Sequence, residues 1–335
     1  MSARVIGFTH PPIAHGGPST FQTRLMEELR LRGWKIVFPE DNIRPDVILI
    51  VGGTTRLWWL IRCKWKGSRI VHRVAAIHWR HHVEKHSFKI FFLLEVRNLI
   101  VRLIRKYLAD HIIYQSLFAE NWWLSKRGAT KADGSIIYNG TNTQLFKPTG
   151  EKANKKTLEI ACVEGNIAAN GFIVPLIRRI AQVKTGHKEV RVNIFGNASA
   201  ELKAALSDMN NVVFHGHIPR AEMPLRLAEN DIFLSLEINA ACPNSIIEAM
   251  AAGLPVIAFA TGATPELVSE DTGMLLKYDA DPWQLGLPTI GQEVDMAVEK
   301  INANLEGFAE KARQRALKYH DATNMTDAYL KILDR

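Results

Sequence analysis

The sequence predicts an α/β protein with two consecutive parallel sheets. Short apolar runs alternate with amphipathic stretches along the 335 residues, as expected when helices join parallel strands. The length is sufficient for two hydrophobic cores, and the lysine-rich stretch that follows 146–150 separates two such series of elements. We therefore expect an N-terminal domain over 1–148, a second domain over 149–310 and a closing helix over 311–335.

The first series begins with an apolar strand, and Gly16-Gly17 lies between it and a helix that Ser19 or Thr20 caps. Amides at such a helix start can face a phosphate or a sugar, although a Gly-Gly pair alone is also typical of a tight turn. Runs of Val and Ile indicate strands buried on both faces. The expected strands are 5–8, 35–38, 47–51, 69–74, 111–114 and 135–138.

The second series repeats the same alternation of strand and helix. Its expected strands are 158–163, 190–195, 212–214, 232–236 and 255–259. The pattern from residue 294 onward is mostly helical.

The most informative stretch is 243–266, which predicts a helix, a buried strand, a glycine loop and a second helix start. Asn244 or Ser245 can cap the first helix, and Thr264 can cap the second ahead of a proline. Two helix starts at the carboxyl edge of one sheet favour a diphosphate. Glu248, one turn into the first helix, could accept hydrogen bonds from a ribose diol. The stretch therefore indicates a nucleotide site.

Charge is unevenly distributed along the chain. The net charge is +8, but residues 1–148 carry +13 and the remainder −5. Within 56–107 there are 13 basic and 2 acidic residues. Such a field attracts an anionic membrane, a phosphorylated acceptor or nucleic acid.

Residues 88–107 predict a basic amphipathic helix that carries Arg97, Arg102, Arg105 and Lys106. Its apolar face fits either packing on the sheet or attachment to a membrane surface. The pairs 58–59 and 122–123, each Trp-Trp, fit an interface or a core equally well.

Several classes of protein lack support in the sequence. It contains no P-loop, no HExxH motif and no complete dinucleotide fingerprint, which argues against kinase, metalloprotease and dehydrogenase activity. Cys63, Cys162 and Cys242 are too far apart in sequence for a paired framework and fit a reducing compartment. No signal-peptide core opens the sequence, and no apolar stretch is long and uncharged enough to cross a bilayer.

Five histidines cluster at positions 72, 78, 81, 82 and 86. His78, His82 and His86 have helical i, i+4 spacing, but no carboxylate beyond Glu84 supports a metal site there, and none is predicted. Histidines beside an acceptor groove fit better. Arg73, at the end of a strand, and His78 are the expected catalytic residues, able to handle a proton or a phosphate.

These features resemble the retaining glycosyltransferases of family four, which have the GT-B fold. The resemblance is carried by Gly16-Gly17, the run from Asn139 to Asn142 before Phe146-Lys147-Pro148, and the segments 194–196, 213–217 and 243–266. It implies two Rossmann-like domains that face each other across a cleft. It also implies that the helix in 311–335 returns to the first domain.

The resemblance further implies where a nucleotide sugar binds. Glu248 would hold the ribose, the loop 241–245 and the turn 262–264 would approach the diphosphate, and 216–219 would lie by the base. Gly16-Gly17 would close over the donor sugar. The implied donor-binding residues are Gly16, Gly17, Asn166, Gly216, Pro243, Asn244, Ser245, Glu248, Gly262, Ala263 and Thr264.

The chain departs from the family pattern at three positions. Ala240 stands where the family usually has a glutamate, eight residues before Glu248, and Gly165 and Asn170 replace an arginine and a lysine. A departing diphosphate needs positive charge, which helix dipoles, Arg73 or Arg178 could supply.

The expected function is a metal-independent glycosyltransferase without a cofactor, acting in cell-surface polysaccharide or glycolipid synthesis. The expected partners are a nucleoside-diphosphate sugar, a glycan or lipid-linked acceptor and an anionic membrane surface, and the expected location is the cytoplasm or the inner membrane face. The alternatives are a catalytically weakened, nucleotide-sugar-binding or regulatory protein of the same fold and, less favoured, a nucleic-acid-binding protein. Nucleic acid is not an expected partner, because no reading module is recognisable.

Overall fold

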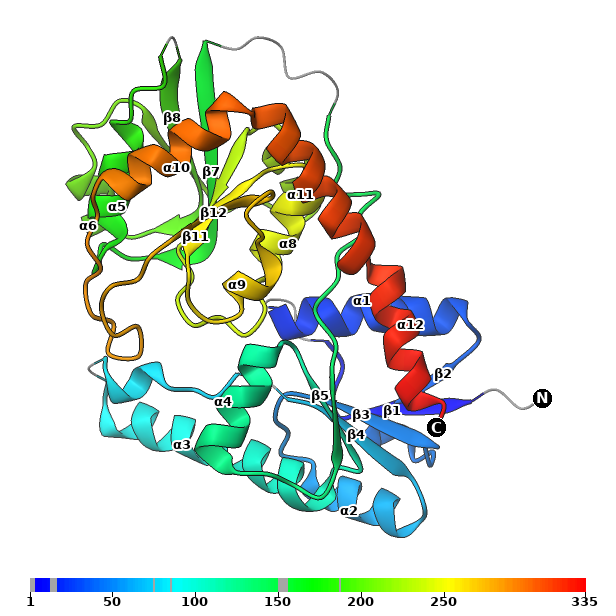
Figure 1. The fold of residues 1–335 in the computed structure, drawn as a ribbon. Helices are drawn as coiled ribbons and strands as arrows, with labels where there is room; N and C mark the ends of the chain where they lie inside the picture. Colours follow the sequence, from blue (N-terminus) through cyan, green and yellow to red (C-terminus); the bar gives the residue numbers. More distant parts are fainter. Residues whose placement is uncertain (1–3, 13–16, 75, 85, 150–155, 187) are drawn as a thin grey trace. The chain divides into compact units, whose positions relative to one another are not determined.

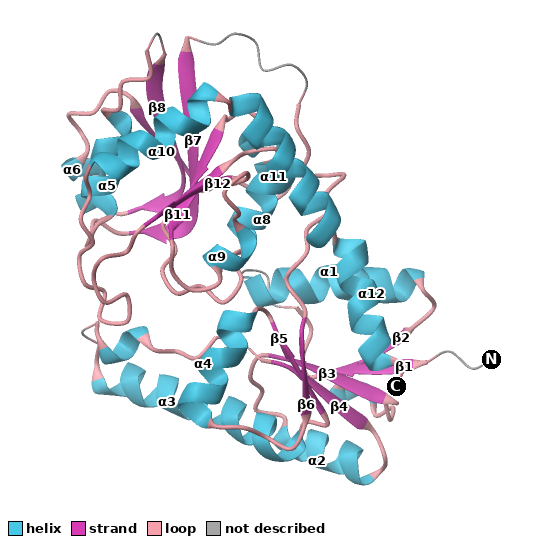
Figure 2. Ribbon diagram, in the orientation of Figure 1, coloured by secondary structure: helices cyan, strands magenta, loops and turns pink. Residues whose placement is uncertain are grey.

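A computed structural model describes residues 4–12, 17–74, 76–84, 86–149, 156–186 and 188–335. The chain forms two compact units, one from Met1–Gly140 with Ala322–Arg335 and one from Thr141–Asp321. In each unit, helices flank a central sheet (Figure 2). The units meet in sequence at Gly140 and Thr141, whereas the sequence analysis places the boundary at 148/149.

Unit 1 contains a six-stranded parallel sheet with the order β2-β1-β3-β4-β5-β6 (Figure 1). Its strands are β1 (Val5–Phe8), β2 (Lys35–Val37), β3 (Val47–Val51), β4 (Arg69–Arg73), β5 (His111–Tyr114) and β6 (Asp133–Ile136). The chain changes direction across the sheet at β1 and β3, because β2 lies on one side of β1 and all later strands lie on the other. Ligands of open α/β sheets bind beyond the carboxyl ends of strands at such a point.

The helices of unit 1 follow the strands in alternation. They are α1 (Gly17–Leu31), η1 (Pro39–Asp41), α2 (Leu57–Trp65), η2 (Arg80–His82), α3 (Phe88–Leu103), the π-helical turn η3 (Ile104–Leu108), α4 (Leu117–Arg127) and α12 (Ala322–Leu333). Ser87 and Ser116 cap α3 and α4 by accepting hydrogen bonds from backbone amides of the first turn.

The last helix completes the core of unit 1. Met325, Tyr329 and Ile332 of α12 are buried together with Phe21 and Leu25 of α1. The rings of Phe21 and Tyr329 lie 5.1 Å apart. The segment 311–335 expected as one closing helix contains the end of α11 and all of α12, and the break between them coincides with the division between the units.

Unit 2 has a second six-stranded parallel sheet with the order β12-β11-β10-β7-β8-β9. Its strands are β7 (Thr157–Ile167), β8 (Glu189–Ala198), β9 (Val212–Gly216), β10 (Ile232–Leu234), β11 (Val256–Phe259) and β12 (Gly273–Leu276). Its helices are α5 (Ile173–Ala181), α6 (Ala200–Ala205), α7 (Met223–Ala228), α8 (Asn244–Ala251), α9 (Thr264–Leu267), α10 (Gln292–Ala303) and α11 (Leu305–Tyr319).

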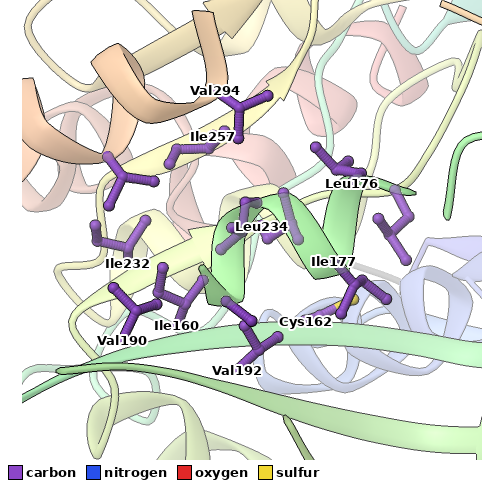
Figure 3. Packing of buried hydrophobic residues seen from close by; sticks show 14 of the residues in the cluster. Ile160, Cys162, Leu176, Ile177, Val190, Val192, Ile232, Leu234, Ile257 and Val294 are labelled. Carbon is purple, nitrogen blue, oxygen red and sulfur yellow. The ribbon is translucent and has the colours of Figure 1, made fainter. Parts of the chain in front are cut away.

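The core of unit 2 joins its sheet to the helices packed on it. Ile160 of β7, Val192 of β8 and Leu234 of β10 meet Ile177 of α5 and Val294 of α10 (Figure 3). All five are at most 2 % exposed. Burying each such side chain contributes roughly 1.5–3 kcal/mol, so this core holds the carboxyl ends of the strands in fixed positions.

Several expected elements differ in extent from those observed. The strand expected at 135–138 lies at 133–136, β7 continues four residues beyond 163, and β12 was not expected. The expectation of one continuous α-helix over 88–107 is wrong in detail, because α3 ends at Leu103 and is followed by a π-helical turn. Trp122 and Trp123 are buried, which favours the core interpretation for that pair, whereas Trp58 is exposed. Among the described residues, no helix has the length and apolar character needed to span a bilayer.

Candidate functional site

The donor-side site expected in 243–266 lies at the reversal point of the second sheet. From β7 the chain builds outward to β8 and β9 and then returns to the other side of β7 as β10. The loops after β7 and β10 therefore lie side by side at the carboxyl edge, where ligands of open α/β sheets bind. The loop after β10, residues 235–243, leads directly into α8.

Helix α8 begins differently from the expectation. Pro243 is its N-cap, without a side-chain capping bond, and Asn244 and Ser245 are the first two helical residues. Capping by either residue was thus wrong. The Ser245 hydroxyl instead donates to Oε1 of Glu237 at 3.4 Å. Amides in the first turn of a helix have no acceptor within the helix, so an anion at this start remains chemically favourable.

Glu248 occupies a nearly buried position in α8. Its side chain is 12 % exposed, and Oε1 accepts a hydrogen bond from Nη2 of Arg220 at 3.0 Å. Arg220, in the loop between β9 and α7, is 56 % exposed. A carboxylate in this place requires a hydrogen-bond donor or a cation, because an unpaired buried charge is costly. The arrangement thus places a carboxylate at the sheet edge beside an exposed guanidinium.

The glycine loop after β11 packs directly on the loop after β10. The Ala263 amide donates to the Ala240 carbonyl at 2.9 Å. Gly262 has φ +60°, and a Cβ there would lie 2.6 Å from the same carbonyl oxygen, so glycine is required. Ala263 is the N-cap of the four-residue α9, and Thr264 is its first helical residue. The expected cap at Thr264 was therefore wrong.

Gly216 ends β9 with φ +73°, which turns the chain into the loop that carries Arg220. The preceding His215 ring stacks on Phe195 at 4.5 Å, and its Nε2 is 2.9 Å from Oδ1 of Asn193. Burial lowers the pKa of His215, with nearby Arg226 as the next cause. The turn at Gly216 thus follows an imidazole that stacks on the Phe195 ring.

The third loop of the donor side lies after β7. Gly165 and Asn166 belong to the exposed end of β7 rather than to a loop, and the Asn197 amide lies 3.5 Å from Oδ1 of Asn166. Asn170 is exposed in the following turn. Gly196 of β8 allows its backbone to lie close to that of Glu164 in β7, since a Cβ at Gly196 would lie 1.8 Å from the Glu164 carbonyl oxygen.

Arg178, a candidate substitute cation, is paired with an acidic side chain. Its guanidinium forms two hydrogen bonds with the Asp208 carboxylate, at 2.6 and 2.7 Å. The Asp208 hydrogen bonds raise the pKa of Arg178 and hold the charge within this pair. The pairing of Arg220 with Glu248 could not be predicted, because nothing in the sequence of 216–222 indicates it.

Asn239 is a second residue that the sequence did not single out. It lies in the loop after β10 with φ +55°, and its buried Nδ2 has no hydrogen-bond partner among the described residues. A buried amide without an acceptor costs about 1–3 kcal/mol. Unsatisfied groups and left-handed asparagines gather at functional loops, so Asn239 joins the candidate donor-side residues.

Unit 1 contains a cavity of about 540 Å³ at its own reversal point. It is lined after β1 by Thr9 and His10, after β3 by the stretch from Gly53 to Arg56, and after β4 by Ala76 and His78. Arg97, Asn98, Ile100 and Val101 of α3 and Trp123 of α4 complete the wall. The cavity thus combines an aromatic ring, basic side chains and polar groups, the combination that suits a sugar or a phosphorylated head group.

His78 is held in this cavity wall through its backbone. Oδ1 of Asn98 accepts from the His78 amide at 2.9 Å, and Nδ2 donates to the His78 carbonyl at 2.9 Å. Burial lowers the pKa of the His78 imidazole, with Arg97 as the next cause. The expected His78 therefore lines a cavity, with an imidazole whose pKa lies below its ordinary value.

Arg73 and His72 are buried rather than open to a groove. Arg73 donates from Nη2 to Oδ1 of Asn139 at 2.7 Å, and its guanidinium lies 4.0 Å from the Phe21 ring centre. Its Nε has no partner among the described residues. His72 is fully buried and lies 2.7 Å from the Gly52 carbonyl through Nε2. An exposed role for His72 is wrong, and a catalytic role for Arg73 stays a prediction.

Two further expectations concern the N-terminal glycines and the histidine spacing. Gly16 lies outside the described residues, and Gly17 is the first residue of α1. His82 lies in the short η2 turn and His86 precedes the start of α3. The i, i+4 spacing of His78, His82 and His86 therefore does not place them on one helix face.

Parts of the chain are similar in sequence to known glycosyltransferases. Residues 165–286 match the family model described as glycosyl transferases group 1. Over 112 residues the chain is 32 % identical to the amylovoran biosynthesis glycosyltransferase AmsK of Erwinia amylovora, covering 31 % of this chain and 28 % of that protein. Over 159 residues it is 29 % identical to a GDP-mannose-dependent monoacylated phosphatidylinositol monomannoside mannosyltransferase of Corynebacterium glutamicum, covering 42 % of each. The matches span less than half the length of these relatives.

Solved structures extend the likeness to the whole chain at the level of fold. Sucrose-phosphate synthase from Thermosynechococcus elongatus superposes with a TM-score of 0.74 at 16 % identity, covering 98 % of both chains. The Anabaena protein HepE, solved with UDP and glucose, gives 0.72 at 14 % identity over 99 % of this chain and 100 % of its own. WaaG, a glycosyltransferase involved in lipopolysaccharide biosynthesis, gives 0.69 at 13 % identity over 98 % and 99 %. The chain has the GT-B fold, and its residues 165–286 match the family model of glycosyl transferases group 1.

Proposed function

We propose that the protein is a glycosyltransferase that moves a sugar from a nucleoside diphosphate to a glycan or lipid-linked acceptor. The observation that carries the proposal is the nearly buried Glu248 carboxylate, one turn into α8 at the reversal point of the second sheet. A carboxylate at a ligand-binding edge can accept hydrogen bonds from both hydroxyls of a ribose diol. The group 1 match over 165–286 and the relatives named above support the same activity.

The donor is placed by the loops of unit 2. Glu248 accepts from the ribose hydroxyls, the start of α8 with Ser245 and the turn at Gly262 approach the diphosphate, and the loop at Gly216 lies by the base. Because Gly165 and Asn170 carry no charge, the first-turn amides of α8 and the nearby Arg220 supply the positive potential. The reaction needs no resident metal in this scheme.

Transfer then breaks the bond between the anomeric carbon and the β-phosphate oxygen and forms one to the acceptor oxygen. The acceptor hydroxyl proton passes to the departing phosphate oxygen, so the diphosphate leaves as an anion with that proton and no protein nucleophile is consumed. Retention of configuration follows if attack occurs on the face from which the diphosphate departs. The cavity of unit 1 that His78 and Arg97 help to line is the proposed acceptor site.

The acceptor is proposed to lie at an anionic membrane surface, to which α3 attaches the protein on the cytoplasmic side. Phe88, Phe92, Leu99 and Leu103 form an exposed stripe along α3. Lys89 and Arg102 are exposed beside it, whereas Arg105 is buried and hydrogen-bonded to the Tyr114 hydroxyl and the Gly128 carbonyl. An apolar stripe flanked by cations is the pattern of a helix that lies in a bilayer interface.

Donor binding tests the proposal. UDP, GDP, ADP and their sugars are titrated into the full chain, with thermal stabilisation and calorimetry as readouts. We expect one nucleotide class to bind, and Glu248→Gln to weaken it about tenfold to a hundredfold, since it removes hydrogen bonds to a charged acceptor. Glu222→Gln, an exposed acid of the same unit, is the matched control.

Turnover separates the enzyme from a binding or regulatory protein of the same fold. Radiolabelled donor is incubated with the chain and with lipid-linked or glycan acceptors, and labelled product is measured. If nucleotide binding depends on Glu248 but no acceptor yields a labelled product, the binding or regulatory alternative is favoured. Absence of nucleotide binding would refute the donor site itself.

A further inference from the structure

We propose that His81, His82 and Glu95 form a binding site for one divalent cation of the Zn²⁺ class in unit 1. This site is separate from the donor-side residues and is not part of the transfer reaction described above. The three side chains come from two elements, the η2 turn and the helix α3. A bound ion would therefore tie these elements together.

The ligand atoms already converge on one point. Nε2 of His81 is 2.9 Å from Oε1 of Glu95, and Nε2 of His82 is 3.3 Å from the same oxygen. All three ligand atoms lie within 4.8 Å of one another. Ligands that surround Zn²⁺ tetrahedrally at 2.0–2.1 Å are about 3.3 Å apart. Only small side-chain movements separate the observed arrangement from a coordination shell.

The donor set indicates the kind of ion. Two imidazoles and one carboxylate suit zinc and the neighbouring first-row metals, and they leave a fourth position for water. Magnesium and calcium prefer oxygen ligands throughout. Zn²⁺ is therefore the expected ion, and Mg²⁺ is the discriminating comparison.

The surroundings orient the ligands. Nδ2 of Asn98 donates to Oε1 of Glu95 at 3.2 Å, a contact of the kind that fixes ligating carboxylates. The Phe91 ring packs edge-on against both imidazoles, at 5.0 and 5.3 Å. The His81 side chain is fully buried, so its ring cannot rotate away from the site.

The charges around Glu95 also favour a cation. It is one of only two acids in the strongly basic segment 56–107, yet among the described residues no Arg or Lys forms an ion pair with it. Its ionic partners are the two histidines. A carboxylate that faces two imidazoles rather than a guanidinium has its charge available for an added ion.

A route for the ion is open. The side chain of His82 is 52 % exposed and that of Glu95 is 36 % exposed. A cavity of about 190 Å³, lined in part by His81 and His86, adjoins the cluster. An ion can thus enter from solvent without opening the core.

Occupancy would stiffen the wall of the proposed acceptor cavity. Asn98 contacts Glu95 with its side chain and holds the His78 backbone with two hydrogen bonds. The same asparagine therefore links the ion site to the segment that carries His78. Zn²⁺ acts here as a structural clamp between η2 and α3.

Metal titration of the tag-free full chain tests this site. After treatment with EDTA and dialysis, ZnCl₂ is added and binding is measured by calorimetry and native mass spectrometry. We expect one equivalent of Zn²⁺, a raised Tm and no response to Mg²⁺. His82→Ala and Glu95→Gln are each expected to weaken binding at least about tenfold and to abolish the rise in Tm.

His86→Ala is the matched control, since this histidine lies in the same segment and contacts Glu84 instead of Glu95. It is expected to bind zinc like the unaltered chain. Circular dichroism establishes that each variant is folded, and Glu95→Gln keeps the size of the side chain should His82→Ala fail to fold. The proposal is overturned by absence of binding, by equal binding in the folded Glu95→Gln variant, or by an equal loss in His86→Ala.

Discussion

Arg220 and Glu248 meet through one hydrogen-bonded ion pair, with Nη2 of the guanidinium 3.0 Å from Oε1 of the carboxylate. The arginine belongs to the loop after β9 and the glutamate to α8, so the pair joins that loop to a helix at the carboxyl edge of the second sheet. Because Arg220 is mostly exposed, the pair itself adds little to stability. Its placement beside the proposed donor makes a role in ligand binding the better explanation.

Arg220→Ala is therefore expected to weaken binding of a nucleoside diphosphate about tenfold and to leave binding of the uncharged nucleoside nearly unchanged, since the lost interaction is with phosphate. Calorimetry of both ligands at two salt concentrations measures the difference, and Arg226→Ala serves as the control on the adjacent helix. Diphosphate affinity equal to or above that of the unaltered chain would mean that Arg220 only competes with the ligand for Glu248.

Gly262→Ala is expected to destabilise unit 2 by about 3 kcal/mol. The new Cβ would lie 2.6–2.8 Å from backbone atoms of Asn239 and Ala240, and φ is +60°. The left-handed conformation alone costs about 1–2 kcal/mol, and the backbone contacts add to it.

Gly186→Ala isolates the conformational part of that loss. Gly186 has φ +63°, but a Cβ there meets no atom within 4 Å, so we expect a loss of about 1 kcal/mol. Urea unfolding of both variants provides the comparison. If Gly262→Ala and Gly186→Ala lose the same free energy of unfolding, the loop of Gly262 adjusts freely to the extra methyl group.

Stability should fall with acid between pH 6.5 and about 4 through His72. Burial, and to a smaller extent Arg105, lower its folded-state pKa from 6.5 to about 4, while the hydrogen bond with the Gly52 carbonyl opposes this shift. The unfolded chain therefore takes up the proton first as the pH falls, and the folded state loses about 3 kcal/mol across this window. Above pH 7 both states are neutral and the effect vanishes.

His72→Gln removes this titration while its amide can still donate to the Gly52 carbonyl. We expect a lower free energy of unfolding at pH 7 but a flatter dependence between pH 6.5 and 4, measured by urea unfolding at each pH. An unchanged slope would assign the acid sensitivity to other groups.

Phe92→Asp should release the protein from anionic vesicles. Phe88 and Phe92 stack at 6.5 Å on the exposed stripe of α3, and a carboxylate there opposes both insertion and attraction to the surface. Cosedimentation with phosphatidylglycerol vesicles, compared with phosphatidylcholine, is the measurement. Leu31→Asp, which alters an exposed leucine on α1, should bind as the unaltered chain does. If Phe92→Asp binds anionic vesicles as well as the unaltered chain does, the exposed stripe of α3 does not attach the protein to membranes.

The sheet strands of both units were predictable because their signal is local. Val47 to Val51 and Val256 to Phe259 are uninterrupted apolar runs, and such runs indicate buried parallel strands whatever surrounds them. β12 escaped prediction because Gly273 opens it and only three apolar residues follow. Capping by Asn244 was wrong because Pro243 already supplies the extended backbone from which α8 begins.

The sequence by itself determined the α/β alternation of strands and helices, the basic character of the first half and the carboxylate one turn into the helix at 244–251. Each depends on residue type and spacing along a few turns or strands. Tertiary structure alone decided that Arg220 meets Glu248, that Gly262 lies against Ala240, and that Glu95 meets two histidines 13 and 14 residues earlier. These pairings depend on how helices cross and how loops turn at a sheet edge, and chain packing sets that geometry, not any local pattern.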